Sequence, residues 1–161
     1  MNTDVDYTYS FVVPVDPIGA FAAAAAPQTW WNEMIEGTAS QVGRTYIFDV
    51  PGLHHSKFQV TEADVGKRLA WKVIPSGDET ELDEWIGTIV VFDFAPGPAG
   101  THITFTHRGL QPQLACHTVC STAWAYHLQM GLQALLTGGN PAPITATNID
   151  RVAAAVGARQ L

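Results

Sequence analysis

The stretch from Glu84 to Trp124 constrains the fold of this chain most strongly. It holds two extended segments, 84–94 and 101–107, separated by a short turn rich in proline and glycine. Strands joined by so short a turn pair in antiparallel fashion. A long segment follows, 113–137, and its apolar positions share one helical face: 116, 120, 124, 128, 132 and 135–136. The stretch therefore predicts a curved antiparallel sheet whose chain continues into one long closing helix, an arrangement that often encloses a pocket.

Other segments show the alternation and the turn boundaries that are typical of strands. They cover residues 7–13, 36–40, 45–50, 56–62 and 68–74. Asp16 followed by Pro17 is typical of a helix start, so we expect a helix from Pro17 to residue 26. Residues 29–31 are expected to form a second short helix or a turn. The fold class is therefore α+β, with residues 1–141 as a single domain and 142–161 as an extension that carries a short helix over 149–156.

Charge and composition exclude several classes of partner. The net charge is −7 and the chain has only eight Lys and Arg, which argues against nucleic acid and anionic membrane surfaces. The longest small apolar run, 20–26, is much shorter than the roughly 20 residues that cross a bilayer. The first residues lack the basic region of a secretory leader. Two cysteines in such a chain indicate reduced thiols, so we expect a cytoplasmic protein.

Alternation along the strands gathers apolar side chains on one face of the sheet. The residues that share this face are Phe58, Val60 and Glu62, then Leu69, Trp71 and Val73, then Ile103, Phe105 and His107. Glu62 and His107 are polar, and burying them requires hydrogen-bond partners. Two interpretations remain open: a filled core, or a pocket between these side chains and the stripe of Cys116, Cys120 and Trp124.

Metal and thiol chemistry are the less favoured interpretations of the polar residues. The histidines at 54, 55, 102, 107, 117 and 127 and the two cysteines show none of the paired spacings of a zinc site, and His54 and His55 follow a Pro-Gly turn that favours exposure. We therefore expect no metal and no cofactor. His107 could activate the Cys116 thiol, but a buried cysteine more often behaves as a small apolar residue.

Acid–base chemistry would use Glu62 or His107, because a carboxyl on an apolar face has a raised pKa. The simpler interpretation of Glu62 is an ion pair with Lys67 or Arg68 beside the turn. No catalytic set follows from the sequence, and an enzyme of the cyclase or hydrolase kind is the least favoured hypothesis.

The residues also match a family pattern. The matching positions are Trp30, Trp31, Ile35, Glu36 and Gly37; Glu62, Lys67, Arg68, Leu69 and Trp71; Trp85, Gly87 and Thr88; Phe105, Thr106, His107, Gly109 and Leu110; Cys116, Cys120 and Trp124; and Thr137, Gly138 and Gly139. Over roughly residues 7–141 the chain resembles the activator-of-Hsp90-ATPase-homologue branch of the SRPBCC (START-related, birch-pollen-allergen-like) superfamily.

The resemblance implies a helix-grip fold: a seven-stranded antiparallel sheet around a long C-terminal helix, with two short helices after the first strand. Members commonly hold a hydrophobic ligand between helix and sheet, whereas others are co-chaperone domains that act on an ATPase, or cyclases. Fold alone does not decide among these. The tail after Pro141 departs from the family pattern.

The favoured hypothesis is the binding of a small hydrophobic or aromatic molecule between sheet and helix. The expected ligand-binding residues are Trp30, Trp31, Phe58, Glu62, Trp71, Trp85, Phe105, His107, Cys116, Cys120 and Trp124. The alternative is a protein-interaction module for a chaperone ATPase or a homodimer. It requires a filled interior and an exposed apolar patch, for example around Trp30 and Trp31.

Overall fold

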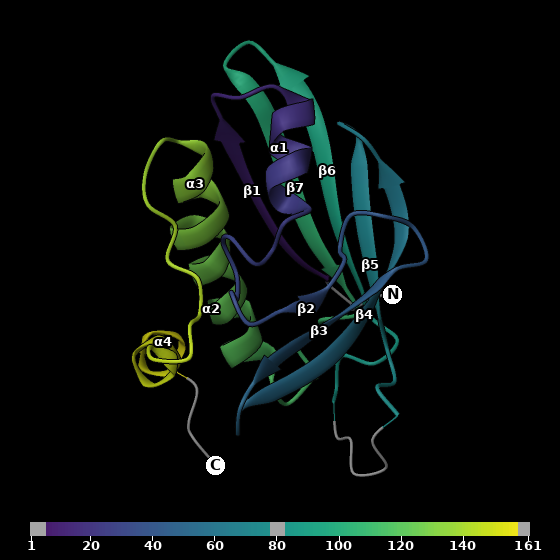
Figure 1. The fold of residues 1–161 in the computed structure, drawn as a ribbon, viewed down its shortest axis with the longest axis vertical. Coiled ribbons are helices and arrows are strands. Elements are labelled where there is room, and N and C mark those ends of the chain that lie inside the picture. Colours follow the sequence, from purple (N-terminus) through teal and green to yellow (C-terminus); the bar gives the residue numbers. More distant parts are fainter. Residues whose placement is uncertain (1–5, 78–82, 158–161) are drawn as a thin grey trace.

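A computed structural model describes residues 6–77 and 83–157. Its centre is one antiparallel sheet in the order β1-β7-β6-β5-β4-β3-β2 (Figure 1). The strands are β1 (Tyr7–Val13), β2 (Glu36–Gly37), β3 (Thr45–Val50), β4 (His54–Asp64), β5 (Arg68–Ile74), β6 (Ile89–Gly97) and β7 (Gly100–Arg108). The first strand pairs with the last, with Phe11 opposite Ile103, so the two ends of the domain are joined by backbone hydrogen bonds. The seven-stranded sheet predicted from the sequence is confirmed.

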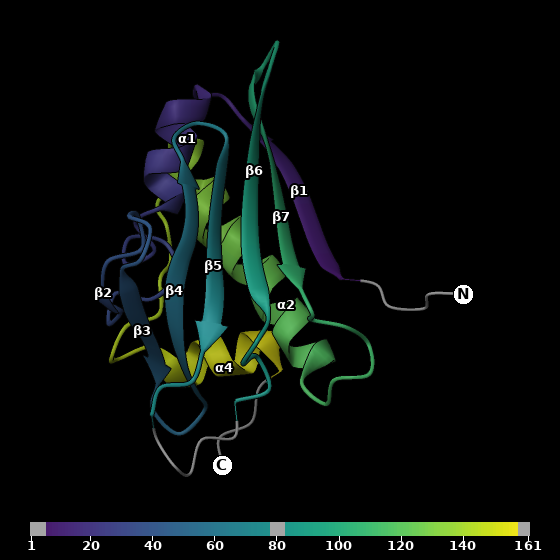
Figure 2. The same ribbon diagram turned by 90° about the vertical axis from the view of Figure 1, so that its right-hand side faces the viewer.

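The closing helix lies across one face of this sheet (Figure 2). It consists of α2 (His117–His127), a π-helical segment η1 (Leu128–Gln133) and α3 (Ala134–Leu136). The side chains at the predicted apolar positions Cys120, Trp124, Leu128 and Leu132 are buried. The helix-grip architecture is therefore confirmed.

Two shorter helices complete the fold. In α1 (Pro17–Ala24), the Asp16 carboxylate accepts a hydrogen bond from the Gly19 amide at 2.7 Å, which is the N-cap that the sequence indicated. Residues 27–31 form hydrogen-bonded turns, and the Trp31 amide donates to the Pro27 carbonyl. The last helix, α4 (Ile149–Val156), packs beside α2. No helix in the described part of the chain is long and apolar enough to cross a membrane.

The strand predicted over 84–94 begins only at Ile89, so its first part was predicted wrongly. Residues 84–87 form a turn in which the Thr88 amide donates to the Trp85 carbonyl at 2.8 Å. Gly87 has φ of +90°, a conformation that glycine adopts without steric cost. The prediction failed because Trp85 and Thr88 favour strands by type, whereas the backbone turns at Gly87.

The closing helix also begins later than predicted, at His117 instead of residue 113. Its π-helical segment contains Gly131, which lies against the backbone of Trp30. A Cβ atom at Gly131 would lie 2.2 Å from the Trp30 carbonyl oxygen. Glycine is therefore required for the close approach of the closing helix to the turn that follows α1.

We predict that Gly131→Ala lowers the free energy of unfolding by about 2 kcal/mol or more, because the added methyl group forces two backbone segments apart. Urea unfolding followed by circular dichroism measures this change. Gly97→Ala is the matched control, since its Cβ would meet no atom within 4 Å. Equal stability of the two variants would contradict the proposed close contact.

A tryptophan-lined pocket between sheet and helices

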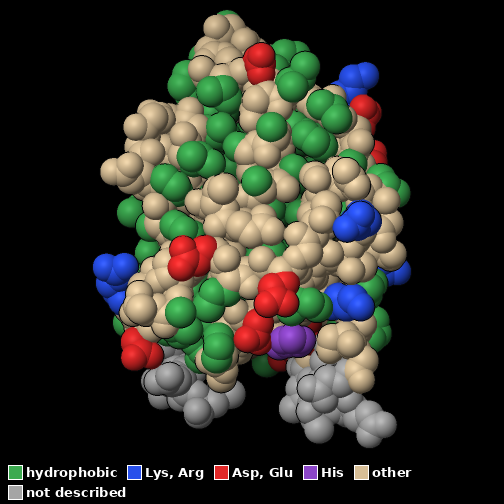
Figure 3. Space-filling view, in the orientation of Figure 1, with side chains coloured by type: hydrophobic (Ala, Val, Ile, Leu, Met, Phe, Trp, Pro, Cys, Tyr) green, Lys and Arg blue, Asp and Glu red, His purple; other side chains and the backbone are tan. Residues whose placement is uncertain are grey.

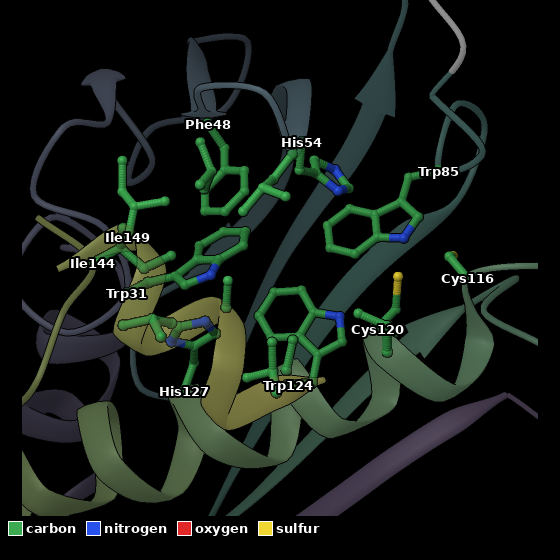
Figure 4. A pocket seen from close by; sticks show the side chains of 17 residues that line it. Trp31, Phe48, His54, Trp85, Cys116, Cys120, Trp124, His127, Ile144 and Ile149 are labelled. Atoms are coloured by element: carbon green, nitrogen blue, oxygen red, sulfur yellow. The ribbon is translucent and has the colours of Figure 1, made fainter. Parts of the chain in front are cut away.

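An apolar pocket of about 300 Å³ lies between the sheet, the start of the closing helix and α4 (Figure 4). Its lining residues are Trp31, Phe48, Val50, Leu53, His54, Trp85, Cys116, Val119, Cys120, Ala123, Trp124, His127, Ile144, Ile149, Val152, Ala153 and Val156. The described lining contains no Lys, Arg, Asp or Glu. The interior is thus not fully filled, and its open part is almost entirely apolar.

Three tryptophans from separate segments form the centre of the pocket wall. Trp31 comes from the turn after α1, Trp85 from the turn before β6, and Trp124 from α2. The ring centroids of Trp31 and Trp124 lie 4.7 Å apart. Trp85 stacks on Trp124 with a centroid distance of 5.7 Å and an interplanar angle of 13°. Such offset aromatic contacts are favourable beyond their buried area, so the three indoles stabilise one another as a rigid wall.

His107 is connected by hydrogen bonds to two of these tryptophans, directly to Trp124 and through Thr88 to Trp85. The Trp124 indole Nε1–H donates to His107 Nδ1 at 3.0 Å, and His107 Nε2 lies 2.7 Å from the Thr88 hydroxyl. An indole can only donate, so Nδ1 must be unprotonated and the neutral ring carries its proton on Nε2. Nε2–H then donates to Thr88, whose hydroxyl donates to the Trp85 carbonyl at 2.5 Å. Burial lowers the pKa of His107 to about 3, consistent with this neutral state.

The turn that carries Trp85 is fixed by a second hydrogen-bond network. The Trp85 amide donates to Asp83 Oδ1 at 2.9 Å, and the Ser56 hydroxyl donates to Asp83 Oδ2 at 2.5 Å. His54 Nε2 lies 2.6 Å from the same hydroxyl, and its ring lies 4.3 Å from the Trp85 ring. Burial lowers the pKa of His54, although the nearby Asp83 carboxylate opposes the shift. The prediction that His54 is exposed was therefore wrong: it lines the pocket.

The two thiols lie at the Trp85 end of the pocket (Figure 4). A hydrogen bond between the two side chains lowers the pKa of Cys116, the acceptor, and the same interaction together with burial raises the pKa of Cys120. His107 does not serve as a base for Cys116, because both of its ring nitrogens are engaged by Trp124 and Thr88. Within the described residues no three His, Cys, Asp or Glu side chains gather as metal ligands.

The structure brings part of the predicted site together. Trp31, Trp85, Cys116, Cys120 and Trp124 line the pocket. The other predicted residues do not: Trp30, Phe58, Trp71, Phe105 and His107 are fully buried in the core beside it, and Glu62 lies outside. The aromatic core residues thus support the pocket wall without reaching the open space.

The side chain of Glu62 is half-exposed and lies 4.0 Å from the Arg68 guanidinium. A β-bulge between Val60 and Glu62 shifts the pairing with β5, so the alternation that places Val60 in the core no longer holds two residues later. The predicted burial of Glu62 was therefore wrong, and the simpler ion-pair interpretation is correct.

Sequence reasoning missed most of the pocket's aliphatic lining. Phe48 and Val50 lie on the buried face of β3, a signal that its alternation already contained. The buried residues of α4 are Val152, Ala153 and Val156, which together with Ile149 recur at helical spacing. This helix is part of the pocket wall and not a detached appendage.

A curved antiparallel sheet closed by a long helix over an apolar pocket defines a helix-grip domain. The family model described as Activator of Hsp90 ATPase homolog 1-like protein matches residues 19–137, and the chain belongs to this family. The matched region ends before α4, so five lining residues lie beyond it, at positions 144, 149, 152, 153 and 156.

Solved structures share the fold. The Aha1 dimer from Colwellia psychrerythraea is 25% identical, with a TM-score of 0.70 over 84% of this chain and 98% of that chain. A protein from Mesorhizobium loti is 18% identical, with a TM-score of 0.67 over 82% and 96%. One from Staphylococcus saprophyticus is 16% identical, with a TM-score of 0.65 over 88% and 98%. No match was found among curated proteins.

Two buried histidines make the stability of this fold depend on pH. Burial lowers the pKa of His107 to about 3 and that of His127 to about 4, whereas an unfolded histidine titrates near 6.5. Below about pH 6.5 the unfolded state therefore binds more protons than the folded state. Above this pH each histidine makes its full contribution to the free energy of unfolding. That contribution is lost as the pH falls towards the pKa of the histidine in the folded state.

We predict that His127→Gln makes the loss of stability on acidification less steep by about 1.4 kcal/mol per pH unit between pH 6.5 and 4. Urea unfolding at several pH values measures the slope, and exposed His102 provides His102→Gln as the control for removal of one imidazole. Parallel slopes for wild type and His127→Gln would show that His127 is not held neutral by burial.

Proposed function

We propose that this protein binds a small, apolar or aromatic molecule in the pocket formed by Trp31, Trp85 and Trp124. The observation that carries the proposal is the almost wholly apolar space of about 300 Å³ beside three mutually packed indoles. That volume is at the lower end of the range for small-molecule sites. Membership of a family whose fold commonly holds hydrophobic ligands supports the same reading.

Transfer of the ligand out of water supplies the driving force. Apolar surface gains roughly 25 cal/mol per Å² on leaving water, and the rigid wall loses little freedom when the ligand enters. The absence of charged side chains from the described lining means that no ion has to be desolvated. An uncharged ligand is therefore favoured over an anion or a cation.

We predict that the protein binds N-phenyl-1-naphthylamine, an uncharged probe whose fluorescence rises in apolar sites. Ala123→Phe should weaken this binding at least tenfold, because Ala123 lines the pocket and the larger ring occupies the space of the probe. Ala125→Phe, on the same helix but outside the lining, is the control. Equal affinity of both variants, each shown to be folded by circular dichroism, would place the probe elsewhere.

A protein-interaction role is the second candidate, and the similarity to a dimeric Aha1 favours it. The patch first considered for this role is not available, since Trp30 and Trp31 are 0% and 2% exposed. Large apolar side chains that are exposed, such as Val12, Val42 and Met130, come from well-separated segments. Hydrophobic side chains are likewise dispersed over the face in Figure 3, with Lys and Arg mainly on its right-hand side.

We predict that an interaction role would use the surface and not the pocket. Stimulation of an Hsp90-type ATPase by the wild-type chain would then be retained by Ala123→Phe, and sedimentation analysis would reveal a dimer. A monomer without effect on the ATPase would remove this candidate. Acid–base catalysis by Glu62 or His107 is not supported, because neither residue lines the pocket.

A further inference from the structure

A chain of short hydrogen bonds fixes where His54 carries its proton. The Ser56 hydroxyl donates to Asp83 Oδ2 at 2.5 Å, and His54 Nε2 lies 2.6 Å from the same hydroxyl oxygen. A hydroxyl group has only one proton to donate, and here the carboxylate takes it. The Ser56 oxygen must therefore accept a hydrogen bond from His54, so Nε2 carries the ring proton. In the neutral ring Nδ1 is then unprotonated and can only accept.

The surroundings of this chain keep the proton arrangement fixed. Ser56 is fully buried and the Asp83 side chain is 3% exposed, so water does not compete for their hydrogen bond. Burial also lowers the pKa of His54, which keeps its ring neutral at pH 7. Neither Ser56 nor Asp83 lines the pocket. They set the chemistry of His54 from outside the open space.

His54 presents its second nitrogen as an accessible acceptor. Nδ1 makes no hydrogen bond within the described residues and, unlike Nδ1 of His127, it is not enclosed by protein atoms. The His54 side chain is 25% exposed and lines the pocket. It shares the inner face of β4 with Ser56 and Phe58, and its ring lies between those of Phe48 and Trp85 (Figure 4).

The fixed tautomer restricts what a bound molecule can place against Nδ1. An acceptor such as an ether, a ketone or a carboxylate finds no proton there, so the molecule must donate. A cationic donor is disfavoured, because the described lining contains no carboxylate to balance its charge. An uncharged hydroxyl group remains. A phenolic hydroxyl is a stronger donor than an alkyl one, and its ring suits a wall of packed indoles.

We propose that the pocket takes an uncharged aromatic molecule with a hydroxyl group, which donates its proton to Nδ1 of His54. This rests on the ligand-binding function proposed above and specifies the ligand class. Asp83 and Ser56 are positioning residues: by holding the proton on Nε2 they keep His54 an acceptor towards the pocket. The aromatic body of the ligand packs against the tryptophans, and the hydroxyl group fixes its orientation.

A pair of probes tests the proposal: 2-naphthol, and 2-fluoronaphthalene, whose fluorine is similar in size to a hydroxyl group but has no proton to donate. We expect the wild-type protein to bind 2-naphthol about three- to tenfold more tightly, the usual range for one added hydrogen bond. In His54→Phe, which keeps an aromatic ring without an acceptor, the ratio of the two affinities should fall to about one. The two probes are compared within one variant, so a change in overall affinity does not affect the ratio.

A measurement on the wild-type protein tests the same contact without a substitution. Long-range ¹H–¹⁵N spectra of the imidazoles should show Nδ1 of His54 unprotonated in the free protein. Its ¹⁵N resonance should move on addition of 2-naphthol and stay in place with 2-fluoronaphthalene. This result decides the question even if His54→Phe does not fold.

The remaining outcomes separate this proposal from the proposed function. Equal wild-type affinities for the two probes, or a protonated Nδ1 in the free protein, would overturn the proposed ligand class. A preference for 2-naphthol that persists in His54→Phe would assign the hydroxyl to another lining residue, such as His127, and would overturn it as well. In each of these cases the apolar pocket still binds its probes. Failure of both naphthalenes and of N-phenyl-1-naphthylamine to bind would instead overturn the proposed function itself.

Discussion

The hydrogen bond from the Trp124 indole to the imidazole of His107 connects the closing helix to the sheet. It also determines the proton positions in the rest of the network, since Nδ1 must accept and Nε2 must then donate to Thr88. Thr88 in turn holds the carbonyl of Trp85. One neutral ring, fully buried in β7, thus sets the positions of two of the three tryptophans in the pocket wall. A protonated His107 could not accept from Trp124, so the pocket wall and the charge state of this residue are inseparable.

Most of the fold could be predicted because each strand buries one face, and alternation in the sequence records that face directly. The errors occurred where the backbone departs from regular geometry. The bulge after Val60 reverses the expected side of Glu62, and the turn at Gly87 interrupts a segment whose residue types favour a strand. The close contact of Gly131 with Trp30 lies in a π-helical segment that helical periodicity does not reveal. Each departure is confined to a short segment, too short to alter a hydrophobic pattern.

The candidate site was harder to predict than the fold. Alternation identifies which side chains face the helix, but it does not say where along a strand the two layers separate. Trp71 and Phe105 pack against Phe92, with ring centroids 5.2 Å apart in each pair, and fill the interior there. The open space lies near the β3–β4 hairpin and the start of α2 instead. Its position depends on long-range packing of α4, which no local pattern in the strands contains.

The placement of α4 has a thermodynamic consequence. Five of the lining residues belong to this helix or to the segment before it, and the helix is only eight residues long. So short a helix is not stable alone, and its order depends on the apolar contacts it makes with the pocket. Under the proposed ligand-binding function, a molecule in the pocket would add to those contacts, so occupancy of the pocket and order of the helix would be linked equilibria, each strengthening the other. Sequence changes in α4 would therefore alter ligand affinity by changing the fraction of molecules in which α4 is ordered against the pocket. This would hold even where the changed residue does not contact the ligand.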